Sequence, residues 1–243
     1  MHLWDDTKGY VTIPYNKYAY VKDRNGQHIS LYGERLKRTT TFDKDDPTLH
    51  ESDIPPMTRF LVDQYTDSDE SSTGHRVMFF DIEVEVTDGF PDVQKAYNPI
   101  TSIALYDCTM KKYFTYCFDP HKRIESYEKG EEVVEFYETE YEMLNKFFQK
   151  YLEIRPTIIS GWNSEFFDIP YLYNRAVRIL GTEVANLLSP ISQVIYSEYK
   201  KKHTIAGVSS LDYLQLYRQF TFTQQSSYRL DYIGEVEVGM KKV

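Results

Sequence analysis

The chain has 243 residues, of which 41% are hydrophobic and 16% aromatic, and its formal net charge is −9. This length suits one large domain or a small domain joined to a medium-sized one, and the hydrophobic content is enough for a packed core. The negative charge argues against broad, non-specific attraction to nucleic acid, but it leaves a local binding groove open. No signal peptide, long apolar segment or metal-type cysteine spacing is visible, which predicts a cytoplasmic protein with free, buried thiols at Cys108 and Cys117 rather than a disulfide.

Residues 1–75 are predicted to form a small β-rich N-terminal domain. An apolar run at 18–21 is typical of a strand, and the Asn25-Gly26 pair predicts a hairpin whose second strand is 28–32. Residues 66–74 are polar and charged, with little that could pack, which indicates an acidic linker. The domain boundary is therefore expected at the end of that segment.

The second predicted domain, residues 76–243, begins with a run in which four apolar residues lead into alternating acids. Phe- and Val-rich runs favour β-strands, and strand side chains alternate, so Asp81 and Glu83 share one face. Two like charges emerging from an apolar segment are costly unless a cation offsets them, and carboxylate oxygens suit magnesium. A metal site is one interpretation. An edge strand with a solvated acidic face is the other.

The segments that follow predict a mixed sheet. The expected elements, in chain order, are an antiparallel meander through strands at 100–106 and 112–118, an irregular stretch at 119–134, an amphipathic helix at 138–151, a buried strand at 157–161 and a helix from Asp168 to Leu180. A helix crossing from a meander to a parallel strand is typical of the ribonuclease H-like α/β fold. In that arrangement Asp168 lies beside Asp81 and Glu83, which indicates a two-metal phosphodiester site. The alternative for Asp168 is a helix cap.

Residues 191–207 predict a protruding hairpin with a basic tip. Consecutive lysines suit phosphate contact, so DNA contact is predicted for the tip, with a solvated turn as the alternative. The residues concerned are Tyr199, Lys200, Lys201 and Lys202. His203, which follows them, is expected to be an ordinary surface histidine.

Asp81-Ile82-Glu83 on a strand, with Asn163 and Phe167-Asp168 further on, resembles the first and second exonuclease motifs of family B DNA polymerases. Several longer stretches resemble the replicative polymerases of T-even-type phages. They are Phe80-Asp81-Ile82-Glu83-Val84, Asp88-Gly89-Phe90-Pro91, Gly161-Trp162-Asn163, Phe167-Asp168-Ile169-Pro170-Tyr171, Leu211-Asp212-Tyr213 and the run from Ser226 to Ile233. The resemblance covers about residues 77–234 and is much weaker over the first 75 residues.

This resemblance implies a 3′-5′ proofreading exonuclease that acts on the 3′ end of single-stranded or primer-template DNA. It implies two divalent metal ions, Mg²⁺ or Mn²⁺. By family analogy Asp81 would bridge both ions, Glu83 would bind the ion that activates water, and Asp168 would hold the other ion.

The resemblance also implies contacts with the DNA. Asn163 is similar to a residue that positions the terminal nucleotide, and Phe90 to an aromatic residue beside the unpaired 3′ bases. Phe167, in the second motif, is counted with these DNA-binding residues. The alternative for Phe90 is a loop aromatic packed on the core, and Trp162 is expected to belong to the core.

The family's third motif, a Tyr followed three residues later by an Asp, has no match after Tyr232. Asp212 resembles a family position away from the metals, so it is not expected to replace the missing carboxylate. The fourth carboxylate and the palm, fingers and thumb are then expected on the remaining polymerase polypeptide. Two function classes stay open: a metal-dependent exonuclease, and a non-catalytic DNA-binding and assembly module of a split polymerase. A phage-encoded chain would act in the host bacterial cytoplasm.

Overall fold

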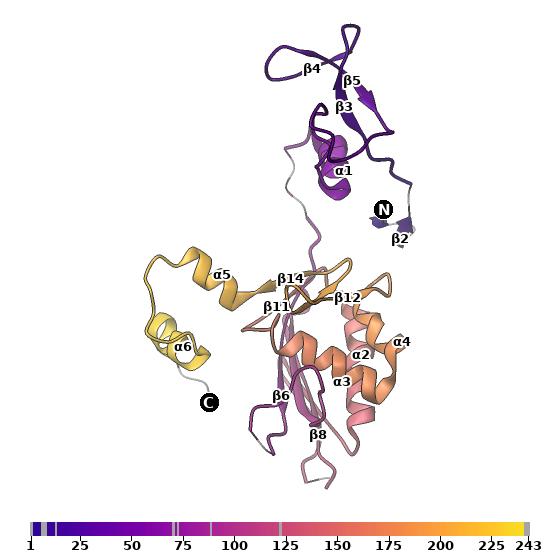
Figure 1. Cartoon of the computed structure of the whole chain (residues 1–243). Helices are drawn as coiled ribbons and strands as arrows, with labels where there is room; N and C mark the ends of the chain where they lie inside the picture. The colour runs from indigo at the N-terminus through magenta and orange to yellow at the C-terminus, as the bar shows by residue number, and fades with distance from the viewer. Residues whose placement is uncertain are drawn as a thin grey trace. The chain divides into compact units, whose positions relative to one another are not determined.

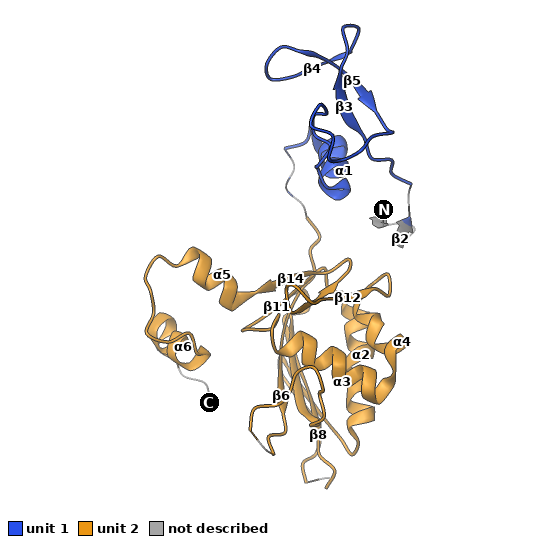
Figure 2. Ribbon diagram, viewed as in Figure 1, with its two compact units in different colours: residues 1–72 blue, residues 73–243 orange. Residues whose placement is uncertain are grey.

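The computed structural model describes residues 2–5, 9–12, 14–69, 71, 73–87, 89–121 and 123–240. It divides into two compact units, residues 1–72 and residues 73–243 (Figure 2). The division falls within the polar segment 66–74.

The N-terminal unit contains a three-stranded antiparallel sheet in the order β3-β5-β4, a separate two-stranded pair and one helix. The elements are β1 (His2–Asp5), β2 (Gly9–Thr12), β3 (Ala19–Lys22), β4 (His28–Ile29), β5 (Arg35–Thr39) and α1 (Pro56–Tyr65). Its buried apolar side chains lie at the start of β3, in β5 and in α1. They are Tyr18, Ala19, Leu36 and Phe60.

The hairpin predicted around Asn25-Gly26 is wrong, because β3 and β4 do not pair with each other. Each of them pairs with β5 instead. A two-residue Asn-Gly hairpin needs positive φ at both central residues, and neither Asn25 nor Gly26 has it. The Gly26 N–H donates to the Asp23 carbonyl at 2.9 Å, and the Asn25 N–H donates to the Asp23 carboxylate at 2.8 Å. This turn redirects the chain without closing a hairpin.

The C-terminal unit is built on a seven-stranded mixed sheet in the order β14-β11-β6-β7-β8-β10-β9. Its strands are β6 (Val77–Val84), β7 (Ile100–Asp107), β8 (Lys112–Phe118), β9 (Tyr127–Lys129), β10 (Glu132–Tyr137), β11 (Ile158–Gly161) and β14 (Ser209–Asp212). β6, β7 and β8 form the predicted antiparallel meander. After helix α2 (Glu140–Ile154), β11 pairs in parallel with β6, as the sequence predicts.

The expectation that residues 119–134 are irregular is wrong, because this region contributes two strands. β10 pairs in parallel with β8 over six residues, and β9 pairs with β10 in antiparallel fashion. The alternation of polar and apolar residues is weak there, since β9 is fully exposed at the sheet edge and β10 is mostly half-buried. Exposed edge strands commonly carry charged residues, which hides them from a search for apolar runs.

Helices lie on both sides of the sheet (Figure 1). α2, α3 (Asp168–Leu180) and α4 (Thr182–Ala185) lie on one side, and α5 (Tyr213–Phe220) and α6 (Leu230–Val238) lie on the other. α2 is capped at its N-terminus by Thr139, whose Oγ1 accepts the Glu142 N–H. None of the described helices is both long enough and apolar enough to span a membrane.

The main core lies between the sheet and helices α2 and α3. Alternate residues of β6 point into it, and Met78, Phe80 and Ile82 are each at most 5% exposed. From the helices it receives, among others, Met143, Leu144, Phe147, Phe148, Ile169 and Leu172. Cys108 and Cys117 are free, as predicted, but half-buried rather than buried.

Phe79, Asp81 and Glu83 occupy the opposite face of β6, where all three side chains are exposed. β6 has β11 on one side and β7 on the other. The alternative of an acidic edge strand is therefore wrong, and both acids lie on an interior strand of the sheet.

Candidate active site

A groove of about 670 Å³ opens over the face of the sheet that carries Asp81 and Glu83. Its walls come from β6, the segment around Phe90, the β11–α3 loop, α5 and the start of α6. The lining residues are Asp81, Ile82, Glu83, Phe90, Trp162, Asn163, Phe167, Asp168, Leu214, Arg218, Tyr228, Arg229 and Leu230. Six of the residues predicted from the sequence are thus brought together in one groove.

Asp168 is tied to the acidic strand by a hydrogen bond. The Ile82 N–H donates to the Asp168 Oδ1 at 3.1 Å. Asp168 is the first residue of α3, the N-cap position belongs to Phe167, and no side chain caps this helix. The capping alternative for Asp168 is therefore wrong, and its carboxylate serves to join α3 to β6.

Asp168 is only 3% exposed, and its surroundings disfavour the charged form. Burial, with a further contribution from the negative charge of Asp81, raises the pKa of Asp168 to about 7. The hydrogen bond from the Ile82 N–H acts in the opposite direction. The groove therefore concentrates negative charge that only a cation or a proton can offset.

The donor types in the groove suit a hard divalent cation, since all three acids offer carboxylate oxygens. Asp81 and Glu83 are exposed to the groove, whereas Asp168 is buried at its base. Within the described ranges, however, no group of three His, Cys, Asp or Glu side chains is arranged to hold a metal ion. The chemistry of the donors fits a metal, but these side-chain positions do not form an assembled centre.

The loop that carries Asn163 is held by a buried carboxylate beneath it. Asp212 is 2% exposed and accepts the backbone N–H groups of Asn163 at 3.0 Å, Glu165 at 3.1 Å and Leu214 at 3.0 Å. Asn163 has a φ of 64°, a left-handed conformation that asparagine tolerates better than most residues. Asp212 does not line the groove, so its contribution is to shape the loop and to cap α5.

Two aromatic rings flank the carboxylates. The ring centroids of Phe90 and Phe167 are 5.2 Å apart, and Phe90 is 81% exposed. The alternative that Phe90 packs on the core is therefore wrong. Asp88, which begins the turn before Phe90 in the sequence motif, lies outside the described residues.

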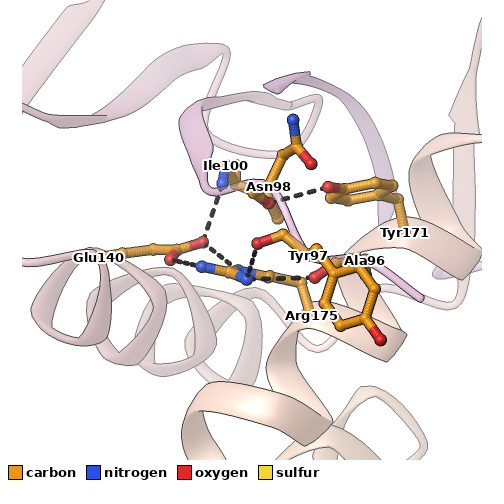
Figure 3. Close-up of polar contacts among 7 residues, drawn as sticks. All are labelled: Ala96, Tyr97, Asn98, Ile100, Glu140, Tyr171 and Arg175. Carbon is orange, nitrogen blue, oxygen red and sulfur yellow. Dashed lines mark hydrogen bonds and ion pairs between the residues drawn. The ribbon is translucent and has the colours of Figure 1, made fainter. Parts of the chain in front are cut away.

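A buried ion pair anchors the segment that follows Phe90 (Figure 3). Arg175 on α3 and Glu140 on α2 form two contacts, Nε to Oε1 at 2.8 Å and Nη2 to Oε2 at 2.5 Å. Arg175 Nη1 also donates to the carbonyls of Ala96 at 3.1 Å and Tyr97 at 2.6 Å. Glu140 Oε1 accepts the Ile100 N–H at 2.8 Å. The pair thus fixes the backbone that leads into β7.

Two further side chains of α3 hold the same segment. The Tyr171 hydroxyl donates to the Asn98 carbonyl at 2.8 Å (Figure 3). Asn174 Nδ2 donates to the Val93 carbonyl at 2.9 Å. Since α3 also begins with Asp168, one helix positions both a groove carboxylate and the segment that follows Phe90.

The predicted DNA-binding hairpin forms, with β12 (Val194–Ser197) pairing antiparallel to β13 (Lys202–Ile205), but it does not line the groove. Tyr199 is 93% exposed, and Lys200 is also exposed at the tip. Lys201 pairs with Glu198 at 2.9 Å. Lys202 belongs to β13 rather than the tip and pairs with Glu165 at 2.8 Å, so the basic tip is smaller than predicted.

The expectation that His203 lies at the surface is wrong. Its side chain is 6% exposed and lies near the rings of Tyr173 and Tyr196, with centroid distances of 4.9 and 5.0 Å. Its Nδ1 is buried without a hydrogen-bond partner among the described residues, and burial lowers the pKa of His203. Residues alternate along β13, and this position points inward under α3.

Three polar residues of the groove were not singled out by sequence reasoning: Arg218 on α5, and Tyr228 and Arg229 just before α6. The Arg218 guanidinium lies 4.4 Å from the centre of the Tyr228 ring. The Trp162 Nε1 donates to the Tyr228 carbonyl at 3.1 Å, which joins this wall to the β11–α3 loop. The resemblance of the run from Ser226 to Ile233 to phage polymerases could have pointed to Tyr228 and Arg229, which lie within it.

Comparisons with known proteins identify the family of this chain. The family described as DNA polymerase family B, exonuclease domain, matches residues 60–233. A DNA-directed DNA polymerase of Escherichia phage RB69 is 36% identical over 197 residues, which are 69% of this chain and 22% of the relative. A DNA-directed DNA polymerase of Enterobacteria phage T4 is 34% identical over 191 residues, or 66% of this chain and 21% of the relative.

A more distant relative is a DNA polymerase catalytic subunit of Equine herpesvirus 2, which is 26% identical over 185 residues, or 70% of this chain and 18% of the relative. The chain therefore spans about a fifth of the length of these relatives. The family match covers most of the chain and includes every residue that lines the groove. The chain belongs to DNA polymerase family B, and residues 60–233 correspond to the exonuclease domain of that family.

Proposed function

We propose that this chain hydrolyses the 3′-terminal phosphodiester bond of single-stranded DNA and acts as the proofreading portion of a phage-type polymerase. The observation that carries the proposal is the shared groove of Asp81, Glu83 and Asp168, with the exposed Phe90 ring beside them. Carboxylates on an interior strand suit hydrolysis of a phosphodiester, and an exposed ring suits an unpaired base.

The proposal extends to the fold and the domains. A meander of β6, β7 and β8, followed by the crossover helix α2 and the parallel strand β11, supports a ribonuclease H-like exonuclease domain at 76–243. Residues 1–75 would then be a separate N-terminal domain. The polymerase activity named for the relatives is assigned to the remaining polymerase polypeptide, which is proposed as a partner.

Asp81, Glu83 and Asp168 are proposed to hold two divalent ions, Mg²⁺ or Mn²⁺. When bound, such ions supply a hydroxide at neutral pH and stabilise the charge on the leaving oxygen. The chain's own contribution is to hold the acids in place. Asp168 is oriented by the Ile82 N–H, and Asp81 and Glu83 share one face of β6 because strand residues alternate.

The aromatic wall is proposed to bind the unpaired end of the strand. Stacking on a ring tolerates any base, as proofreading requires, and is worth about 1–3 kcal/mol per base. Phe90 and Phe167 would supply this surface, and Asn163 would position the terminal nucleotide from the β11–α3 loop. At the hairpin, Tyr199 and Lys200 would contact DNA directly, while Lys201 and Lys202 hold the hairpin through Glu198 and Glu165.

The test uses a 5′-fluorescent single-stranded oligonucleotide with Mg²⁺ or Mn²⁺, and with EDTA as a blank. The wild-type chain should produce a ladder of products shortened from the 3′ end. Asp81→Ala and Asp168→Ala should abolish the ladder. Glu132→Ala, which removes an exposed acid from β10 at the far side of the sheet, should leave it unchanged.

DNA binding without any shortening by the wild-type chain would contradict autonomous catalysis. It would support the alternative of an assembly module that needs a second polypeptide. Shortening that persists in Asp81→Ala would show that the nuclease lies elsewhere.

A further inference from the structure

Two arginines face the same groove as the three acids. Arg218 comes from α5, and Arg229 lies just before α6, so both reach the groove from the helices on the open side of the sheet. These two arginines are the basic side chains that line the groove among the described residues. Their positions follow from the fold, since they are far along the chain from Asp81 and Asp168.

Arg218 is held in a defined place rather than projecting freely. Its guanidinium stacks on Tyr228 at 4.4 Å, an arrangement in which an aromatic ring attracts the cation and leaves its N–H edges open. Tyr228 is in turn fixed through its carbonyl, which accepts the Trp162 Nε1–H at 3.1 Å. Trp162 directly precedes Asn163, so this arginine is coupled to the site loop.

The charges of both arginines are available to a ligand. Elsewhere in this unit, cations near the loop are neutralised, as Lys202 is by Glu165 at 2.8 Å. In the described part of the chain, neither Arg218 nor Arg229 forms an ion pair with a carboxylate, although acids line the same groove. Both side chains are exposed. A guanidinium with free N–H groups matches the oxygens of a phosphate in a two-pronged contact.

We propose that Arg218 and Arg229 bind backbone phosphates of the strand whose 3′ end lies at Asp81 and Asp168. This inference rests on the proposed function, because it assumes that a nucleic acid strand enters the groove. A polyanion entering a groove lined by three acids needs cations along its path. The arginines would supply them on the wall opposite the sheet, next to the acids rather than among them.

Binding can be measured without cleavage by fluorescence anisotropy of a labelled single-stranded oligonucleotide in EDTA, over a series of KCl concentrations. Each phosphate contact on single-stranded DNA contributes about 0.7 to the slope of log K against log salt. Arg218→Gln and Arg229→Gln should each lower the slope by about that amount and weaken binding roughly tenfold at low salt. Lys129→Gln, the same change of charge on the exposed strand β9, should leave both unchanged.

The contacted phosphate can be located with oligonucleotides that carry one neutral methylphosphonate at successive positions from the 3′ end. The wild-type chain should lose affinity at particular positions. Arg218→Gln should be insensitive to replacement at one of them, and Arg229→Gln at another. Both variants change exposed side chains, and Arg218→Gln loses only its stacking on Tyr228, so both melting temperatures should lie within a few degrees of the wild type.

Wild-type slopes in both arginine variants, with intact DNA binding by the wild-type chain, would overturn the inference and leave the proposed hydrolysis standing. Lower slopes with no cleavage of DNA in Mg²⁺ or Mn²⁺ would support the phosphate contacts while contradicting the proposed chemistry. A wild-type chain that binds no single-stranded DNA would overturn both.

Discussion

The backbone N–H of Ile82 donates a hydrogen bond to the carboxylate of Asp168, across 86 positions of sequence. Ile82 lies between the two acids of β6, so this bond places a third carboxylate beneath them. It also explains how Asp168 tolerates burial, because one of its oxygens is satisfied by a backbone donor. The contact joins the two sequence motifs into one site.

Asp168 is expected to reduce stability in the absence of metal. Burial of its charge beside Asp81 raises its pKa to about 7, so at pH 8 the fold must hold an unfavourable carboxylate. Asp168→Asn removes the charge and keeps an oxygen that can accept the Ile82 N–H. In EDTA at pH 8 this variant should melt a few degrees higher than the wild type, while losing any nuclease activity.

The control is Asp107→Asn, which changes another buried acid. Asp107 accepts the N–H groups of Thr109 and Met110, so neutralising it should lower the melting temperature or leave it unchanged. If Asp168→Asn melts below the wild type under these conditions, the charge at this position is not a burden on the fold.

The Arg175–Glu140 pair is expected to be costly to break. Both side chains are less than 10% exposed, and removal of one partner leaves a buried, unpaired charge. Arg175→Met should lower the free energy of unfolding by about 3–5 kcal/mol in urea denaturation. The double variant Arg175→Met/Glu140→Leu should lose less than the sum of the two single variants.

An exposed ion pair provides the comparison. Lys201→Ala/Glu198→Ala removes a pair with both side chains at least 70% exposed, and it should change stability by no more than about 1 kcal/mol. Equal losses for the buried and the exposed pair would contradict the anchoring role of Arg175.

Most of the strands and helices near the site could be predicted from the sequence, but not all the residues that line the groove. The meander, the crossover to β11 and the helix starting at Asp168 follow from apolar runs and periodicity, which are local signals. The Asn25-Gly26 hairpin failed because backbone angles at these residues depend on pairing with β5. β9 and β10 were missed because partial exposure weakened their alternation.

Burial and groove lining depend on tertiary contacts that no short window contains. His203 follows three lysines in the sequence, yet the alternation of side chains along β13 turns it inward beside two tyrosines. Arg218 lies on α5, and this helix is brought to the groove by the packing of Trp162 on Tyr213, on Tyr217 and on the segment around Tyr228.

His203 should make stability sensitive to mild acid. Burial lowers its pKa, so the native state keeps the ring neutral while the unfolded chain binds a proton near pH 6.5. Stability is therefore fully present above pH 6.5 and is lost as the pH falls through that range toward the lower, folded-state pKa. His203→Phe should flatten this loss, which is at most about 1.4 kcal/mol per pH unit.

The measurement is a set of urea unfolding curves between pH 5 and 8. His121→Phe, which removes an exposed histidine, should follow the wild-type curve. Parallel pH dependence in His203→Phe and the wild type would show that another group governs the loss at low pH.

Gly161 should resist replacement for a steric reason. A Cβ at this position would lie 2.6 Å from the Phe80 carbonyl oxygen and 2.9 Å from the Ser164 Cβ, so β11 and β6 would be pushed apart. Gly161→Ala should cost about 1–3 kcal/mol of stability and weaken nuclease activity, because the strand carrying Asp81 shifts. Thermal melting and the oligonucleotide assay check both effects.

Gly130 offers a contrast, since it has a φ of 62° and a Cβ added there would meet no atom of the described residues within 4 Å. Gly130→Ala should cost about 1 kcal/mol through backbone strain alone and leave activity intact. If both variants behave alike, close packing of β11 on β6 does not control the site.

The strand order of the sheet also determines when the groove can form on the ribosome. β6, β7 and β8 can pair as soon as they are synthesised, but the other edge of β6 must wait for β11, and β11 must wait for β14. Until then a largely apolar strand keeps an open edge, the kind of surface that recruits chaperones or aggregates. The groove is thus among the last parts of this unit to be completed, although its first acid is made early.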